Sequence, residues 1–289
     1  MKRILLTLGG LAEESRIPIT GKGSLQPLQQ EQIRKALYET YRYQCLDSSK
    51  EDIRLVRVHA NGGQSGQINC NLEHHNMRDL VGNRFYDAIS YVWGSSARTD
   101  KVLCDDHTSH LCVTTNLRNI LEKLALEPSK FPNRRPYWID GICINQEDEQ
   151  ERGHQVRKMA NIYRRAARVH IFLGAFSTSQ PILQSQWLAR RWVIQEAVAA
   201  QTAVVHLQRD GEWEQLAWRD FVGVVNDGRS AEATELRPAA NLLRGLAETK
   251  ATRWSGIFPL LLKFHATECY DDRDRLYALL GVSSDVELK

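Results

Sequence analysis

The segment that most limits how this chain can fold is Tyr137–Gln146, where an apolar run passes directly into polar residues. A long, charged helical pattern follows at once. A buried strand that delivers Asp140 and Asn145 to the edge of a sheet is how α/β proteins build binding sites. Two other segments, 86–94 and 190–196, repeat this change from apolar to polar side chains.

Short apolar strands alternate with helical patterns from residue 85 onward. The clearest helix covers Asp148–Ala167, with acidic residues at its start and arginines near its end, which complements the helix dipole. Helices that separate short strands predict an α/β fold with a mostly parallel sheet flanked by helices, as in a flavodoxin-like core. Expected strands are 53–58 and 68–72 as N-terminal β additions, then 88–92, a hairpin of 101–104 and 111–113, 137–144, 169–173 ending at Gly174, and 203–207. Two further helices are expected, one capped by Thr114 or Thr115 and one over Trp187–Ala200.

We expect three parts along the chain. Residues 1–40 form an N-terminal extension and a helix whose pattern covers Gln29–Tyr41. Residues 41–210 form the α/β domain, and residues 211–289 form a helical region that packs on it. The first ten residues resemble a signal peptide weakly, but their apolar core is short, which favours a first β-strand.

Charge and cysteine usage exclude several classes of protein. Lysine and arginine number 38 against 35 acidic residues, and a net charge of +3 gives no electrostatic case for nucleic acid or a membrane surface. The longest apolar runs, such as 257–262, are too short to cross a bilayer. The six cysteines are scattered, which is typical of reduced thiols in an intracellular protein, so we expect a cytoplasmic location.

Three segments place unusual side chains where strands end. They are the stretch that carries Ser90, Tyr91 and Trp93, the stretch that begins at Asp140, and the loop that leads to Trp187. Because ligands of open parallel sheets bind beyond the carboxyl ends of the strands, this convergence indicates a site. The alternative is that Trp93 and Trp138 are core aromatics and Asp140 is a capping or ion-pairing carboxylate.

Glu196 is the strongest candidate for a reactive group. On a continuous helix it shares a stripe with Leu188, Trp192 and Ala199, so its carboxylate would lie beside apolar surface. Burial there would raise its pKa, as is common at active sites. A structural salt bridge with Arg190 or Arg191 is the alternative.

Two other motifs carry little chemistry. Cys104, His107, His110 and Cys112 have a spacing unlike the common zinc sites and straddle a predicted hairpin turn, so we expect a polar turn and no metal. The glycine-rich stretch 62–66 follows a strand but precedes no helix, which argues against a phosphate-binding loop.

Several motifs in the same order resemble the heterokaryon-incompatibility (HET) domain. The resemblance covers about residues 41–210 and is consistent to 285, with departures at Gly141, where the family usually has a larger residue, often Ala, and at Asp272, where Pro is usual. The motifs are 86–94, Val113–Leu117, Trp138–Gln146, Glu151–Arg152, Gln155–Val156, Met159, Ile162–Tyr163, Arg190–Glu196 and the later stretch 271–281.

The resemblance implies a fungal protein of non-self recognition and programmed cell death. The HET domain is thought to be distantly related to Toll/interleukin-receptor (TIR) domains, and Trp192–Glu196 is similar to the TIR Trp-x-x-x-Glu pattern. That similarity implies Glu196 as the catalytic residue for cleaving the nicotinamide–ribose bond of NAD, with NAD as substrate and no cofactor required. Ser90, Tyr91, Trp93, Asp140, Asn145, Arg190 and Trp192 would then bind the substrate, with an aromatic ring stacking on a base and the polar groups holding ribose or phosphate.

Three functions compete at this point. The first is a NAD-consuming cell-death enzyme that acts when clustered. The second is a non-catalytic signalling module that acts by self-association or with another incompatibility protein, with Glu196 merely structural. The third, a nucleic-acid binder, is disfavoured by the near-neutral charge.

Overall fold

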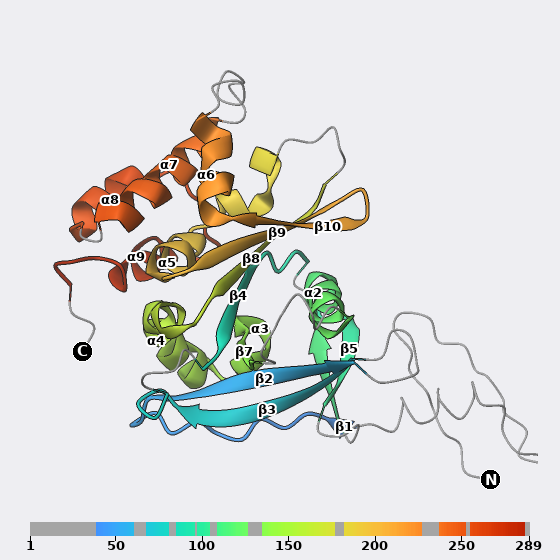
Figure 1. Ribbon diagram of the computed structural model, residues 1–289. Coiled ribbons are helices and arrows are strands. Elements are labelled where there is room, and N and C mark those ends of the chain that lie inside the picture. The colour runs from blue at the N-terminus through green and yellow to red at the C-terminus, as the bar shows by residue number, and fades with distance from the viewer. Residues whose placement is uncertain are drawn as a thin grey trace, which may run out of the picture. The chain divides into compact units, whose positions relative to one another are not determined.

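The computed structural model describes residues 39–60, 68–80, 85–95, 97–104, 109–126, 135–176, 182–226, 237–252 and 255–286. Within these ranges one sheet contains ten strands in the order β1-β6-β5-β3-β2-β7-β4-β8-β9-β10 (Figure 1). The strands are β1 (Glu39–Thr40), β2 (Asp52–Ala60), β3 (Ile68–Asn76), β4 (Asp87–Tyr91), β5 (Asp100–Cys104), β6 (Ser109–Val113), β7 (Tyr137–Trp138), β8 (Val169–Phe176), β9 (Ala203–Arg209) and β10 (Glu212–Ala217).

A parallel block of β7, β4, β8 and β9 forms the centre of the sheet. If these four strands are numbered 1 to 4 along the chain, their order across the sheet is 2-1-3-4. This is the strand order of flavodoxin-like folds. The chain reverses its direction of travel across the sheet between β4 and β8. Such a switch point is where doubly wound folds bind their ligands. The predicted α/β fold with a mostly parallel core is confirmed.

Antiparallel and mixed pairings extend the block on both sides. The predicted N-terminal additions are present, because β2 pairs antiparallel with β3 and with β7. The predicted hairpin is also present as antiparallel β5 and β6. On the far side, β10 pairs antiparallel with β9, so the sheet continues beyond residue 210 before the chain becomes helical.

Helices cover both faces of the block. Figure 1 shows α2 on one side of the sheet and α4 and α5 on the other, with α7 and α8 beyond α5. The helices are α2 (Thr115–Leu126), α3 (Asp140–Cys143), α4 (Glu149–Arg165), η1 (Ile182–Gln184), η2 (Gln186–Ala189), α5 (Val193–Ala199), α6 (Trp218–Asn226), α7 (Arg237–Thr252), α8 (Ile257–Lys263) and α9 (Asp274–Leu280).

Two predicted helices begin as their capping residues indicate. The side chain of Asp148 accepts hydrogen bonds from the backbone NH groups of Gln150 and Glu151 at the start of α4. Thr114 Oγ1 accepts from the NH of Leu117, 3.3 Å away, at the start of α2. Local sequence therefore fixes where both helices begin.

The strand expected over 137–144 is shorter in the structure. It ends at Trp138, and the chain turns into α3 as the NH groups of Ile142 and Cys143 bond to the carbonyl oxygen of Ile139. Aspartate and glycine at positions 140 and 141 have low strand propensity, and the side chain of Asp140 accepts from the NH of Gly141. Asp140 is therefore presented by a short helix.

The helix expected over Trp187–Ala200 is also wrong in part. It is divided into η2 and α5 because residue 190 pairs with Glu268 as an isolated β-bridge. The NH of Arg191 donates to the carbonyl of Glu268, and the NH of Glu268 donates to the carbonyl of Ala189. A contact from nearly eighty positions away thus interrupts a locally good helical pattern.

Gly174 does not stop β8. Its φ of +101° accompanies a shift of register between Phe172 and Ala175, and the strand continues to Phe176. The positive φ favours glycine at this bulge. The strand is three residues longer than expected.

Some expectations fall outside the described residues. These are the N-terminal extension, residues 29–38 of the expected helix, the glycine-rich stretch 62–66, and residues 105–108 of the predicted polar turn. Residues 39 and 40, at the end of that expected helix, form β1, which runs parallel to β6.

Arg191, two residues before α5 begins, connects that helix to the helical C-terminal part of the chain. It is buried, with 1% of its surface exposed. The guanidinium donates to the backbone carbonyls of Phe264 and Arg275 and, at 3.0 Å, to Thr267 Oγ1. Backbone oxygens rather than carboxylates therefore satisfy this cation. Among the described residues, no helix has the length and apolar character needed to span a membrane.

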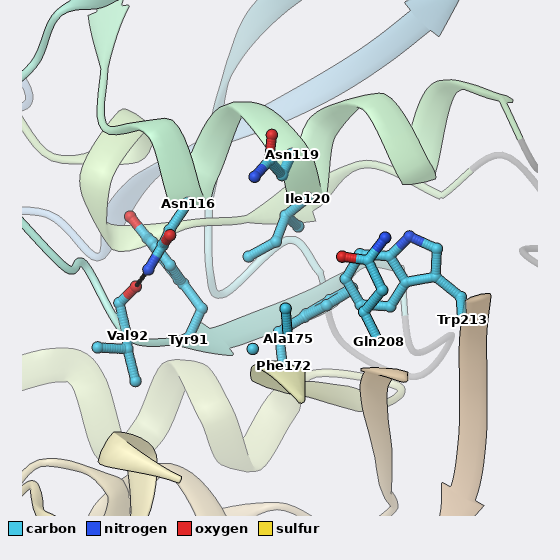
Figure 2. A pocket seen from close by; sticks show the side chains of 10 residues that line it. Tyr91, Val92, Asn116, Asn119, Ile120, Phe172, Ala175, Gln208 and Trp213 are labelled. Carbon is cyan, nitrogen blue, oxygen red and sulfur yellow. Dashed lines mark hydrogen bonds between the residues drawn. The ribbon is translucent and has the colours of Figure 1, made fainter. Parts of the chain in front are cut away.

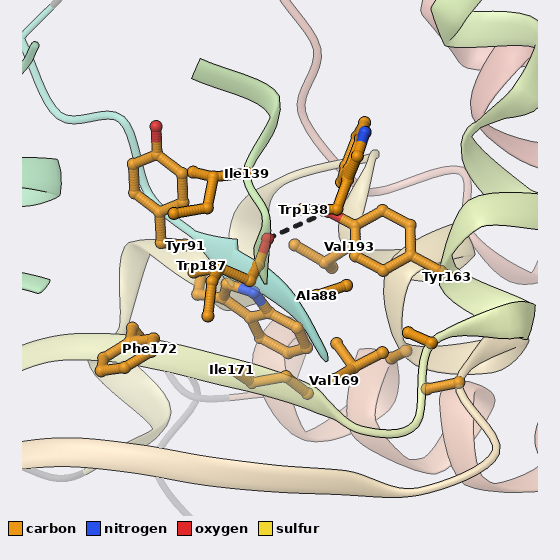
Figure 3. Close-up of a cluster of buried hydrophobic side chains, with 14 of the residues drawn as sticks. Ala88, Tyr91, Trp138, Ile139, Tyr163, Val169, Ile171, Phe172, Trp187 and Val193 are labelled. Carbon is orange, nitrogen blue, oxygen red and sulfur yellow. Dashed lines mark hydrogen bonds between the residues drawn. The ribbon is translucent and has the colours of Figure 1, made fainter. Parts of the chain in front are cut away.

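The core beside the parallel block contains large aromatic side chains. Figure 3 shows Trp138, Tyr163, Trp187 and Val193 gathered around β4. The hydroxyl of Tyr163 on α4 donates to the carbonyl of Ile89, 3.2 Å away. This packing fixes α4, α5 and η2 against the strand that leads into the candidate site.

Candidate functional site

Ser90 and Glu196 form a buried hydrogen-bonded pair near the carboxyl end of β4. Ser90 Oγ donates to Glu196 Oε2 and accepts from Nε1 of Trp187, 2.7 Å away. The exposed fraction is 1% for Ser90 and 2% for Glu196. The serine hydroxyl is therefore fixed in orientation, with the indole on one side and the carboxyl group on the other.

Burial gives Glu196 an unusual acidity. Desolvation raises its pKa from 4.5 to about 7, and nearby Asp140 adds to the rise. The charge of Arg190 and the hydrogen bond from Ser90 oppose it. Glu196 is thus a carboxyl group that changes charge near neutral pH, which is common at active sites.

Asp140 is joined to the end of β4 through Trp93. Its Oδ2 accepts from Nε1 of Trp93 at 2.9 Å, and its backbone oxygen accepts from Nε2 of Gln146 at 2.8 Å. Burial raises the pKa of Asp140, and the charge of Arg190 lowers it. Trp93 also lies under a cation, because the guanidinium of Arg98 is 5.6 Å from its ring centre.

Arg190 links the two acidic groups. Its guanidinium donates to the backbone carbonyl of Tyr91. Its positive charge partly offsets the rise that burial causes in the pKa of both Asp140 and Glu196. The structure therefore brings together side chains from the end of β4, the turn after β7 and the approach to α5. We call Ser90, Trp93, Asp140, Trp187, Arg190 and Glu196 the carboxylate cluster.

Tyr91 contributes its backbone carbonyl to this cluster, and burial, followed by the charge of Asp140, raises the pKa of its hydroxyl. Successive residues of a strand point to opposite faces, so Tyr91 lies on the α2 side while Ser90 faces α5. Its hydroxyl lies against Gly141.

Two other predicted substrate-binding residues bond outside the cluster. The NH of Asn145 donates to Glu151, 2.6 Å away, and its Oδ1 accepts from the NH of Glu147 at 3.3 Å. Trp192 Nε1 donates to Asp274 Oδ2, 3.0 Å away, on the C-terminal part. Both side chains hold the surrounding structure together.

Neither candidate arginine forms an ion pair with Glu196 among the described residues. Arg191 turns toward the C-terminal carbonyls, and Arg190 donates to the carbonyl of Tyr91. Because η2 and α5 are separate, Leu188 is not on the same helix as Glu196, and the expected stripe is broken. Glu196 is nevertheless buried beside apolar surface.

In the described part of the chain, no group of three or more histidine, cysteine or acidic side chains is arranged to hold a metal ion. Of the stretch considered for zinc, Cys104, His110 and Cys112 are described, and His107 is not. The cluster contains hydroxyl, indole, carboxyl and guanidinium groups. These groups suit polar organic ligands.

Residues 86–181 match the model of the family described as heterokaryon incompatibility protein (HET). The chain therefore contains a segment similar to the HET domain. A curated relative, heterokaryon incompatibility protein 6, OR allele, of Neurospora crassa, is 38% identical over 96 residues. That match covers 31% of this chain and 14% of the relative, so the chain spans a small fraction of the relative's length. No solved structure matches the chain.

The matched HET segment contains only part of the carboxylate cluster. Ser90, Trp93 and Asp140 lie inside it, whereas Trp187 and Glu196 lie beyond residue 181. The positions of the strand ends and the resemblance both predict that the two halves lie together. The pairing of Trp187 with Ser90 was not predicted, because a buried tryptophan at that position is equally typical of a hydrophobic core.

The sequence also gave no sign of a buried ion pair that supports the turn after β7. Nη1 of Arg54, on β2, lies 2.6 Å from Glu151 Oε1, on α4. The arginine also donates to the carbonyl of Cys143, 3.1 Å away, and the same glutamate oxygen accepts from the NH of Asn145. The charged residues alternate with apolar ones in the sequence, which resembles a solvated strand face.

Gly141 is the departure from the family pattern that the structure explains. A Cβ at this position would lie 2.5 Å from the hydroxyl oxygen of Tyr91 and 3.3 Å from Leu117 Cδ2. Replacing Gly141 with alanine should therefore lower the free energy of unfolding by about 1–3 kcal/mol through overpacking. Urea unfolding measures this change.

The matched control is Gly153→Ala in α4, where an added methyl group meets nothing within 4 Å. That variant should be neutral or stabilising, because alanine favours a helix by about 1 kcal/mol over glycine. In a Tyr91→Phe background the cost of Gly141→Ala should become smaller. An equal cost with and without the hydroxyl would contradict the clash.

Proposed function

We propose that this protein acts in fungal heterokaryon incompatibility, as an effector of non-self recognition and programmed cell death. The matched HET segment and the similarity to the Neurospora crassa protein of that name support the role. We further propose that the effector step is cleavage of the nicotinamide–ribose bond of NAD in the cytoplasm. The observation that carries this second step is the buried Glu196 held by Ser90 at the switch point of the sheet.

The geometry suits glycosidic chemistry. Loss of nicotinamide leaves a ribose with oxocarbenium character, which an adjacent carboxylate stabilises electrostatically. Glu196 supplies that carboxylate in a site with little water, where charge interactions are strong. Ser90 keeps the carboxyl group oriented, and Trp187 keeps the serine oriented.

The remaining cluster residues have roles that fit an extended, anionic dinucleotide. Arg190 offers a cation for a phosphate, and Asp140 offers acceptor oxygens for ribose hydroxyls. Trp93, half-buried at the end of β4, offers a ring on which a base can stack. The element order also resembles TIR domains, in which a helix after the third parallel strand carries the catalytic glutamate. Here that helix is α5.

The experiment is NAD turnover by the purified protein, with Glu196→Gln as the test variant. Removing the charge that stabilises the transition state should lower turnover by about 10²–10³-fold. Because the pKa of Glu196 is about 7, wild-type turnover should rise between pH 6 and 8 as the carboxylate forms. The matched control is Glu149→Gln, an acidic residue of α4 whose side chain is 87% exposed, which should retain full activity.

Assembly without catalysis is the second candidate function, and one observation favours it. The C-terminal part exposes large apolar side chains on and beside α8 and α9, namely Phe258, Leu262, Tyr270, Leu276 and Tyr277. Such side chains suit self-association or contact with another incompatibility protein. Cell death that persists in full with Glu196→Gln would reject the NAD mechanism and favour assembly.

A further inference from the structure

A small hollow lies on the face of the sheet opposite to Glu196. It opens between α2 and the carboxyl ends of β4 and β8, and its volume is about 80 Å³ (Figure 2). Its lining comes from the two strands that flank the switch point, from α2 and from the β9–β10 hairpin. The crevice beside a switch point is where doubly wound folds bind ligands.

Aromatic rings form much of the wall. Phe172 and Trp213 meet edge to face, with ring centres 5.7 Å apart and planes at 85°. The ammonium group of Lys123 lies 4.6 Å from the centre of the Trp213 ring and helps to fix its place. Tyr91 contributes a third ring from the end of β4. Rings held in this way form a site without a large loss of side-chain entropy on binding.

Three amide side chains add the polar groups. Asn116 Nδ2 donates to the carbonyl of Val92 at 3.0 Å, and Gln208 Nε2 donates to the carbonyl of Gly211 at 2.9 Å. These bonds fix the amide nitrogens and leave the amide oxygens as acceptors. Figure 2 shows Asn119 on the α2 side of the hollow, across from Gln208.

Among the described residues that line the hollow none is charged, and the nearby ammonium of Lys123 lies against the Trp213 ring. A carboxylate or phosphate would give up water there with no cation among the described lining residues to contact it, since the ammonium of Lys123 is already held on the Trp213 ring. Amides instead pair well with the donor and acceptor edge of another amide or of a nucleobase. One buried water needs about 10–15 Å³ of such volume, so the hollow has room for about five to eight waters, or for one ring.

We propose that this hollow binds an uncharged planar ring that carries an amide or amidine edge, such as an aromatic carboxamide or a purine. The ring lies between Trp213 and Tyr91, and its polar edge meets Asn119 and Gln208. The site does not depend on Glu196 chemistry, because Ser90 and Tyr91 direct their side chains to opposite faces of β4.

The test compares benzamide, benzoate and adenosine as probes, using the indole NH signal of Trp213 in a ¹H–¹⁵N NMR titration. A Trp213→Phe variant identifies that signal. Benzamide should bind in the millimolar range, and benzoate, which differs only in its charged edge, should bind at least about tenfold more weakly. Binding of adenosine but not benzamide would assign the site to a purine, and the reverse would assign it to a carboxamide.

Two variants locate the binding. Gln208→Leu removes an amide, and Ala175→Leu fills the hollow from an exposed position at the bulge of β8. Each should weaken benzamide or adenosine binding at least about tenfold. The control Asn241→Leu changes an exposed amide on α7 and should leave binding unchanged.

Three outcomes would overturn the site. They are no shift of the Trp213 signal with either neutral probe, equal binding of benzamide and benzoate, and wild-type binding by a folded Ala175→Leu protein. Probe binding without NAD turnover would leave this inference standing and the hydrolase proposal rejected. The opposite result is NAD turnover without probe binding, with turnover unchanged in Ala175→Leu and Gln208→Leu. It would support the hydrolase proposal and reject the ring site.

Discussion

Replacing Glu196 with glutamine should stabilise the folded protein by about 3 kcal/mol at pH 8 and by less than about 1 kcal/mol at pH 5. The unfolded chain ionises Glu196 above its ordinary pKa of 4.5, whereas the folded protein does so only above about 7. Between these values the folded protein binds more protons than the unfolded chain. The free energy of unfolding of the wild type therefore falls as pH rises, and glutamine removes this penalty.

Urea unfolding of the wild type and Glu196→Gln at both pH values measures the difference. Glutamine keeps an oxygen that can accept from Ser90, so the hydrogen bond survives the change. Glu149→Gln again serves as the control, because its side chain is 87% exposed and is solvated in the folded protein as it is in the unfolded chain. A stabilisation that is the same at pH 5 and pH 8 would mean that the charge of Glu196 is not the cause. Stability lost to a charged group is common where that group is needed for function.

Replacing Arg54 with methionine should destabilise the protein by about 3–5 kcal/mol, the usual cost of breaking a buried ion pair. The side chains of Arg54 and Glu151 are 0% and 7% exposed. The variant would leave the Glu151 carboxylate without its cation and the carbonyl of Cys143 without this donor. Urea unfolding measures the loss as a lower midpoint.

The same strand supplies the matched control. Arg57 pairs with Glu73 at 2.5 Å, but these side chains are 33% and 31% exposed, so Arg57→Met should cost at most about 1 kcal/mol. The double variant Arg54→Met, Glu151→Met should recover much of the loss, because neither charge is then buried alone. Equal costs for Arg54→Met and Arg57→Met would contradict the importance of burial.

Elements with strong local signals could be predicted from the sequence. The amphipathic helix α4 has its Asp148 cap and a complementary charge distribution. The apolar strands β4, β8 and β9 begin within one residue of the predicted positions, although β8 continues past its predicted end. Once strands and helices alternate, the parallel block follows from general rules of chain connection. The close approach of β4, the turn after β7 and α5 also follows, because the ends of parallel strands meet at one edge.

Features that depend on distant contacts could not be predicted. The break before α5 arises from pairing with Glu268, and local periodicity contains no trace of it. The early end of β7 agrees with the low strand propensity of Asp140 and Gly141, but the packing of Gly141 against Tyr91 comes from a distant part of the chain. Trp187 and Arg54 each have several plausible roles in a sequence, and only the folded chain selects one. The hollow beside α2 is invisible for the same reason, since its lining comes from five separate segments.

The way Arg191 is held has a consequence for how the protein could be regulated. The residue on its N-terminal side, Arg190, touches the end of β4, and Glu196 lies one and a half turns further along the chain. The guanidinium of Arg191, in contrast, donates to backbone carbonyls within the last thirty residues described. A shift of that C-terminal segment would therefore displace Arg191, and with it the start of α5, which carries Glu196. Such a displacement would reach the carboxylate cluster through α5 and not through the sheet.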